Sequence, residues 1–107
     1  MASADDFRRL ALSLLGAEEA AHMSHPDFRV GGKIFATLGA PDEEWGMVQL
    51  LPEQQALAME AEPEVFKPAA GAWGRKGSTL VKLEKVPDDW LERTLRWAWE
   101  SRAARRR

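Results

Sequence analysis

The stretch FRVGGKIFATLG, residues 28–39, decides the fold. Two runs rich in aromatic and β-branched residues, a composition typical of strands, flank Gly31 and Gly32. Both glycines tolerate positive φ, which the two central residues of a type I′ turn require. We therefore expect a β-hairpin in which Phe28 lies opposite Phe35, so that the two rings form a cross-strand pair.

The same glycines, followed by Lys33, could instead belong to a phosphate-binding loop. Such a loop needs the pattern G-x-x-x-x-G-K-[ST] between a strand and a helix, so that backbone N–H groups converge on the anion. Here the first glycine of the pattern is missing, Ile34 follows the lysine, and the next residues are typical of a strand. The sequence therefore favours the hairpin turn.

Helical patterns lie on both sides of this hairpin. Ser3 and Asp6 have the spacing of a capping box, which indicates a helix start. The apolar residues that follow recur at the intervals of one helix face: Phe7, Leu10, Ala11, Leu14 and Leu15. Residues 52–62 predict a short helix that begins with proline, and residues 87–104 predict a long one.

The remaining segments are less regular. Residues 17–25, AEEAAHMSH, fit a helix by their alanine and glutamate content, or a short edge strand by their position before the hairpin. Residues 45–51 and 78–86 are strand-like. The Pro- and Gly-rich residues 63–77 predict a long ordered loop, which is often functional at this length.

Together these patterns predict one domain over residues 1–107. The strands gather between helices, which is typical of the α+β class. We expect an antiparallel sheet of about four to six strands with an N-terminal helix, a middle short helix and a C-terminal helix.

The composition excludes several classes of protein. The chain has 107 residues and no cysteine, so disulfides, thiol catalysis and zinc sites built on thiolate are excluded. No apolar run approaches the roughly 20 residues of a membrane span. The first acids precede the apolar residues, the reverse of a secretory signal, so we expect a cytoplasmic protein without a membrane partner.

Charge is distributed unevenly along the chain, although its net charge is only -2. Residues 1–66 hold four basic and twelve acidic side chains, whereas residues 67–107 hold eleven basic and five acidic ones. Such asymmetry indicates a charged partner surface, unless folding interleaves the two halves.

Histidines and acids offer no recognisable catalytic or metal set. The spacing of His22 and His25 can join two metal ligands, but no further histidine or cysteine completes a zinc site. The acids at 42–44 and 88–89 fit a turn and a helix start, where they are solvated. No nucleophile stands in a known catalytic motif. We therefore predict a non-enzymatic protein with no catalytic residue, no metal and no cofactor.

Trp73 differs from the other tryptophans because it lies in the glycine-rich stretch AGAWGRKGS, just before Arg75 and Lys76. An aromatic ring beside basic residues in a loop can stack on a base while the cations contact phosphates. The alternative is that the ring fastens the loop to the core. The C-terminal arginines, Arg102 and 105–107, could add phosphate contacts without reading sequence.

The chain resembles the MmcQ/YjbR family of small bacterial proteins over essentially its whole length, in FRVGGKIFATL, WGMVQL, EPEVFKPAAGAWGRKGSTLVKL and the closing helix. The GGKIFA hairpin and the AWG stretch leading into a strand are the most specific pieces. The resemblance implies an α+β fold of the frataxin-like kind and DNA binding through a double wing of two hairpins or loops. Many members carry a His-Trp pair in the loop. This chain lacks that histidine, which weakens a catalytic or ligand role for the pair.

The leading hypothesis is a non-enzymatic module that binds DNA or another nucleic acid. Arg29 and Lys33 near the hairpin tip, with Arg75 and Lys76, would contact phosphates, and Trp73 would stack or wedge. The alternative is a small-molecule or protein-interaction domain. It would bind an anionic ligand on the sheet face, in a pocket beside Trp73 gated by Lys33 and Arg75.

Overall fold

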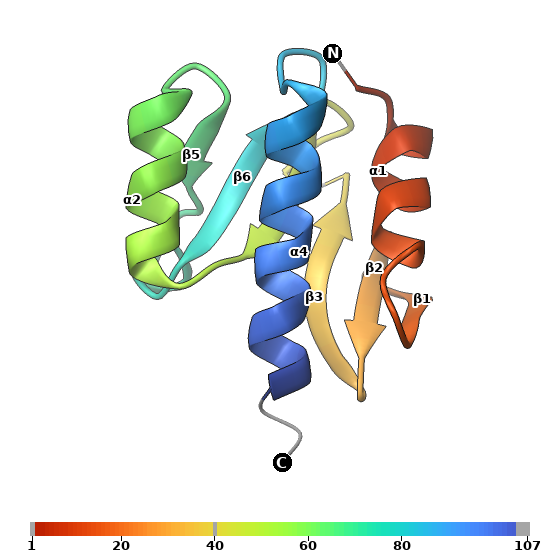
Figure 1. Cartoon of the computed structure of the whole chain (residues 1–107). Helices are drawn as coiled ribbons and strands as arrows, with labels where there is room; N and C mark the ends of the chain where they lie inside the picture. Colours follow the sequence, from red (N-terminus) through yellow and green to blue (C-terminus); the bar gives the residue numbers. More distant parts are fainter. Residues whose placement is uncertain (1, 40, 105–107) are drawn as a thin grey trace.

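The structure, a computed structural model, describes residues 2–39 and 41–104. Its elements follow one another along the chain as shown in Figure 1: α1 (Ala4–Leu12), β1 (Ala17–His22), β2 (His25–Val30), β3 (Lys33–Leu38), β4 (Trp45–Gln49), α2 (Pro52–Ala61), β5 (Phe66–Pro68), α3 (Gly71–Arg75), β6 (Ser78–Lys82) and α4 (Asp88–Ala104).

The six strands form one antiparallel sheet in the order β1-β2-β3-β4-β6-β5. Helices α1, α2 and α4 lie together in front of one face of this sheet (Figure 1). The predicted α+β class is confirmed, as are the antiparallel sheet and the N-terminal, middle and C-terminal helices. Helix α3 is an addition that the sequence did not predict.

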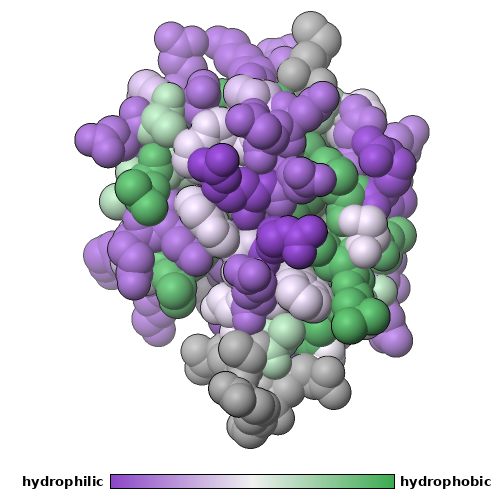
Figure 2. All heavy atoms as spheres, viewed as in Figure 1, coloured by the Kyte–Doolittle hydropathy of each residue, from purple (hydrophilic) through white to green (hydrophobic). Residues whose placement is uncertain are grey.

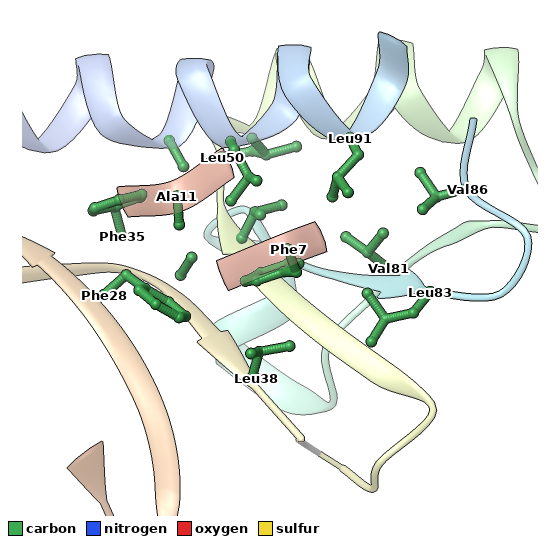
Figure 3. Packing of buried hydrophobic residues seen from close by; sticks show 14 of the residues in the cluster. Phe7, Ala11, Phe28, Phe35, Leu38, Leu50, Val81, Leu83, Val86 and Leu91 are labelled. Carbon is green, nitrogen blue, oxygen red and sulfur yellow. The ribbon is translucent and has the colours of Figure 1, made fainter. Parts of the chain in front are cut away.

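The hydrophobic core fills the space between the sheet and these helices. Phe7 of α1, Phe28 of β2 and Leu91 of α4 are fully buried there (Figure 3). The rings of Phe7 and Phe28 lie 5.9 Å apart between centroids, so α1 packs directly on β2. Burial of one such side chain contributes about 1.5–3 kcal/mol, so the contact of Phe7 with Phe28 helps to hold α1 on the sheet.

Helix α1 begins with the predicted capping box. The backbone N–H of Asp6 donates to Ser3 Oγ at 3.1 Å, and the backbone N–H of Ser3 donates to Asp6 Oδ2 at 3.0 Å. The helix ends at Leu12, earlier than the apolar periodicity indicated. Leu14 is therefore buried from the turn that follows, whereas Leu15 is exposed.

The central hairpin has the predicted turn but a different register. Gly31 and Gly32 have φ of 60° and 81°, as a type I′ turn requires. Phe28 lies opposite Ala36, because the register shifts between Phe28 and Arg29, so the predicted pairing of Phe28 with Phe35 is wrong. This bulge lets Phe28 and Phe35 both be fully buried.

Residues 17–22, which fitted either a helix or an edge strand, form strand β1. Each residue of β1 pairs with one of β2, from Ala17 with Val30 to His22 with His25. The turn between the strands places Met23 and Ser24 at φ of 50° and 69°. Pairing along the whole of β2 overrides the helix propensity of alanine and glutamate.

Residues 63–77 were expected to form a long loop, and this expectation is wrong in part. They contain β5, which pairs with β6 from Phe66 opposite Val81 to Pro68 opposite Thr79, and the short helix α3. The short length of both elements explains why residue patterns did not show them.

Helix α4 begins near the predicted position and packs on the sheet through one face. Leu91, Thr94, Leu95 and Ala98 are buried, and Trp90, Trp97 and Trp99 pack at the edge of the core. Trp99 Nε1 donates to the carbonyl of Leu15 at 2.8 Å, which ties α4 to the turn that follows α1. Among the described residues, no helix combines the length and apolar character needed to cross a bilayer.

Candidate ligand-binding site on the open face of the sheet

The open face is the side of the sheet opposite α1, α2 and α4. Asp27, Thr37, Met47 and Leu80 form one row across it, because they pair in register across β2, β3, β4 and β6. Side chains alternate between the two sides of a strand, so neighbours such as Phe28 enter the core instead. The open face therefore carries its own set of side chains, on which a ligand can bind without disturbing the core.

A cavity of about 360 Å³, the Thr37 cavity, lies on the open face. Three strands supply its floor, and β1, α3 and the end of α4 each supply one residue to its sides. The lining residues are Ile34, Thr37, Met47, Gln49 and Ser78 from β3, β4 and β6, with His22, Trp73 and Arg102 around them. The cavity thus combines apolar floor residues with groups that donate and accept hydrogen bonds.

Thr37 is the unusual residue of this cavity. It is only 1% exposed, and its Oγ1 is the one buried side-chain polar atom without a hydrogen-bond partner in the described part of the chain. By contrast, the hydroxyl of buried Thr79 donates to the carbonyl of Gly77 at 2.8 Å. A buried hydroxyl without a partner destabilises a protein by about 1–3 kcal/mol, and at a cavity a bound ligand would supply the missing hydrogen bond.

The amide of Gln49 is oriented by its neighbour. Ser78 Oγ donates to Gln49 Oε1 at 2.7 Å, which fixes the amide oxygen on the side of Ser78. Within the described residues the amide nitrogen of Gln49 has no hydrogen-bond partner, so its two N–H groups are available to a ligand.

Trp73 is held at the edge of the cavity by the backbone around it. A Cβ on Gly74 would collide with the carbonyl oxygen of Ala69, so only glycine lets α3 pack this closely. Gln55 Nε2 lies within hydrogen-bonding distance of the carbonyls of Gly74 and Ser78, at 3.0 and 3.2 Å. Trp73 as a whole residue is 71% exposed, so the side chain is accessible although the helix is held in place.

Asp27 joins two strands of the open face, β1 and β2. Its carboxylate is fully buried and accepts from Arg29 Nε at 2.8 Å and Nη2 at 3.1 Å, and it lies 2.7 Å from His22 Nδ1. The hydrogen bonds from Arg29 lower the pKa of Asp27, the bond to His22 lowers it further, and burial opposes both. The same contact raises the pKa of Arg29. The group is therefore an ionised pair in which Arg29 is largely neutralised by Asp27.

A second aromatic residue on the open face is Trp45. Lys67 Nζ lies 4.6 Å and Lys82 Nζ 5.1 Å from its ring centroid, distances typical of cation–π contacts. Lys82 also pairs with Glu44 at 2.9 Å, and the hydrogen bond that Lys82 donates to that carboxylate raises the pKa of Lys82. Two cations of the second half of the chain, Lys67 and Lys82, thus reach the open face at Trp45.

The helix side has a different character. Polar and charged residues cover most of the view in Figure 2, and apolar residues gather on the side of α1, where Leu12 and Leu15 are exposed. A hollow between the starts of α1 and α4 is lined by Arg9 and Leu10 and by four carboxylates, those of Asp6, Asp88, Asp89 and Glu92. A polyanion would be repelled from this hollow, which leaves the open face as the better candidate.

Among the described residues, no group of three or more histidines and acids is arranged to hold a metal ion. Of the two histidines considered as metal ligands in the sequence, His22 lines the Thr37 cavity. Its Nδ1 is hydrogen-bonded to Asp27. Its Nε2 is the ring nitrogen left for a ligand.

A family model described as YjbR matches residues 12–101. The chain belongs to the YjbR family. A solved structure, Deinococcus radiodurans protein DR2400 with a DUF419 domain, is 21% identical with a TM-score of 0.77, and the match covers 92% of this chain and 77% of that one. At this identity the likeness shows the fold alone. The search of curated proteins gives no match.

In this YjbR-family protein the five predicted binding residues occupy different environments. Trp73 lines the Thr37 cavity, whereas Arg29 is paired with Asp27 and does not line it. Lys33, at the hairpin tip, and Arg75 and Lys76, at the end of α3, are exposed, and none of these three forms an ion pair with a described residue. The structure therefore places Trp73 beside two accessible cations and leaves Arg29 with little free charge.

Several residues of the site were not found from the sequence. Thr37, Gln49 and Ser78 are ordinary strand residues, and no local pattern distinguishes them. Arg102 was assigned to the C-terminal arginine group, whereas its Nε donates to the carbonyl of Ile34 at 3.1 Å and the side chain lines the cavity. The other arginines of that group, 105–107, lie outside the described residues.

Proposed function

We propose that this YjbR-family protein is a non-enzymatic module that binds nucleic acid, including DNA, through α3 and the open face. One observation carries the proposal: Trp73 is 71% exposed and is followed by two exposed cations, Arg75 and Lys76, without acidic partners in the described part of the chain. An accessible indole beside unpaired cations is suited to stacking on a base while the cations contact phosphates.

The charges of the open face support this proposal. Lys67 stands over Trp45, so a second aromatic ring on the same face lies beside a cation, whereas the neighbouring Lys82 is paired with Glu44. Lys33 adds an exposed cation at the hairpin tip. Arg29 contributes less than the sequence suggested, because Asp27 neutralises it. Binding should therefore be electrostatic and confined to the part of the surface that carries these cations, despite the net charge of -2 for the whole chain.

The non-enzymatic part of the proposal is supported by the use of Asp27. In a catalytic triad the carboxylate is hydrogen-bonded to the histidine that it orients, whereas the carboxylate of Asp27 is shared between His22 and the guanidinium of Arg29. Within the described residues the imidazole of His22 forms no other hydrogen bond, to a hydroxyl or to any other group. This arrangement is typical of a contact that joins β1 to β2.

The test is a titration of labelled single-stranded and duplex DNA, followed by fluorescence anisotropy at about 50 mM and about 200 mM salt. If Lys33, Arg75 and Lys76 each contact a phosphate, binding to the single strand should weaken about 20-fold between the two salt concentrations. Arg75→Gln should make the dependence of log affinity on log salt concentration shallower, by the amount that corresponds to about one phosphate contact. Arg96→Gln removes the same charge from an exposed position of α4 and should leave the salt dependence unchanged. Binding that is absent at the lower salt, or lowered equally by both variants, would contradict the proposal.

The second candidate function is the binding of a small anionic ligand on the sheet face. The guanidinium of Arg102 at the Thr37 cavity favours it, because that group provides a fixed positive charge inside a cavity of ligand size. A thermal-shift screen of small anions distinguishes it from nucleic-acid binding. An anionic metabolite would raise the melting temperature, whereas an oligonucleotide of equal charge concentration would not.

A further inference from the structure

The Thr37 cavity has the size and surface of a site for a flat, partly apolar group. Its volume of about 360 Å³ falls at the small end of the range for ligand pockets. Ile34 and Met47 give its floor an apolar surface, and the exposed ring of Trp73 stands at its side. A planar heterocycle can contact such a floor with one face and the indole with its other face or edge.

The polar groups of the cavity are those that read the edge of a heterocycle. The hydroxyl of Thr37 can donate or accept and has no partner, and the amide of Gln49 offers two N–H donors. A nucleobase presents donors and acceptors side by side along one edge, so it can satisfy both residues at once. A purely anionic ligand would use Arg102 but would leave the accepting capacity of the Thr37 hydroxyl unused.

These groups are already held in position. Ser78 orients the amide of Gln49, Gly74 and Gln55 fix α3 beneath Trp73, and Thr37 lies in the middle of the sheet between Asp27 and Met47. A ligand therefore meets a preformed site and does not have to order it, which favours binding.

We propose that the Thr37 cavity binds a single unstacked nucleobase, with Trp73 stacking on it and Thr37 and Gln49 contacting its edge. This inference rests on the proposed nucleic-acid binding and deepens it, because a base that is part of a nucleic acid can enter the cavity only from a single strand or from a position turned out of a duplex. Arg75 and Lys76, which follow Trp73, then contact the flanking phosphates.

The experiment compares two strands of about ten nucleotides that differ only in their bases, an oligothymidylate and an abasic strand of equal length and charge. Anisotropy gives their affinities for the wild-type protein, Thr37→Val and Trp73→Ala. The wild type should bind the base-bearing strand about tenfold more tightly than the abasic strand. Each variant should reduce this preference to about threefold or less, with little change in abasic-strand binding.

A second measurement locates the base and keeps the test independent of folding. The side-chain amide signals of Gln49 in a nitrogen–proton correlation spectrum should shift when the base-bearing strand is added, and not with the abasic strand. Thymidine monophosphate, tested alone, distinguishes a free nucleotide from a strand as the source of the base. Unfolding curves of Thr37→Val show that lost binding is not lost structure.

Each outcome decides one of the two proposals. Equal binding of both strands, with unshifted Gln49 signals, overturns the base pocket and leaves nucleic-acid binding intact. Shifts of Gln49 with the free nucleotide alone, without binding of either strand, support the pocket and contradict nucleic-acid binding. No response to any of the three probes overturns both.

Discussion

The unpartnered hydroxyl of Thr37 predicts that Thr37→Val stabilises the protein. The substitution replaces a buried hydroxyl by a methyl group of similar size on a central strand, where valine has the higher strand propensity. An unsatisfied buried hydroxyl destabilises by about 1–3 kcal/mol, so we expect the free energy of unfolding to rise by about 1 kcal/mol. For a domain of this size that raises Tm by about 4–8 °C.

The matched control is Thr79→Val. Thr79 is buried in the same sheet, but its hydroxyl donates to the carbonyl of Gly77 at 2.8 Å and lies 3.1 Å from Gln55 Nε2. Its loss leaves buried polar partners unsatisfied, so we expect this variant to be less stable by about 1–2 kcal/mol.

Urea unfolding of the wild type and both variants, followed by far-ultraviolet circular dichroism, measures the two changes on one scale. The variants should differ by about 2–3 kcal/mol with opposite signs relative to the wild type, at an unchanged dependence on urea. If Thr37→Val instead loses as much stability as Thr79→Val, the hydroxyl of Thr37 is already satisfied in the free protein. The reasoning that assigns it to a ligand would then fail.

Three further substitutions test the parts that hold the site. Asp27→Asn should lower the free energy of unfolding by about 2–3 kcal/mol at neutral pH, because Arg29 loses an ionised buried partner. The pKa of Asp27 is lowered in the folded protein, so the stabilisation by its carboxylate is complete above the ordinary pKa and is lost as pH falls through the lowered pKa. The free energies of unfolding of wild type and variant, measured with urea, should therefore converge below about pH 4. A difference that stays constant with pH would contradict this. Ser24→Gly should raise the free energy of unfolding by about 0.5–1 kcal/mol, because the φ of 69° at this position is strained for serine and not for glycine. An unchanged melting temperature would show that the turn is unstrained. Gly74→Ala should lower the free energy of unfolding in urea by about 1–3 kcal/mol and weaken binding of single-stranded DNA, because the added Cβ would displace α3. Wild-type behaviour in both assays would show that the close packing of Gly74 on Ala69 is unnecessary.

The parts of the fold that could be predicted are those fixed by neighbouring residues. The turn at Gly31 and Gly32, the capping box of Ser3 and the apolar face of α4 depend on contacts within a few residues. Strand β1 could not be assigned, because its alanine and glutamate favour a helix and only its pairing with distant β2 decides the structure. The pairing of Phe28 failed for a related reason, since a bulge depends on the packing of both strands on the core.

The site was predictable only where exposure and chemistry coincide in the sequence. Trp73 could be identified because an aromatic residue among glycines and cations is unusual, and the structure finds it exposed. The neutralisation of Arg29 had a visible signal that was missed: Asp27 and Arg29 are two apart on a strand, and such residues share one face. The role of Thr37 had no signal in the sequence, because burial without a partner is a property of the assembled sheet.

Two kinds of polar group therefore share the open face, and they differ in what their burial achieves. Asp27 is buried with two partners, so its carboxylate joins β1 and β2 and contributes to the fold. Thr37, its neighbour in the same row, is equally buried without a partner, so we expect it to lower the stability of the free protein. An apolar residue at Thr37 would make a more stable sheet, as Met47 and Leu80 do further along the row. A polar group that destabilises the empty protein at a cavity is best explained by the state in which the cavity is filled, because there the same hydroxyl gains a partner and contributes to binding.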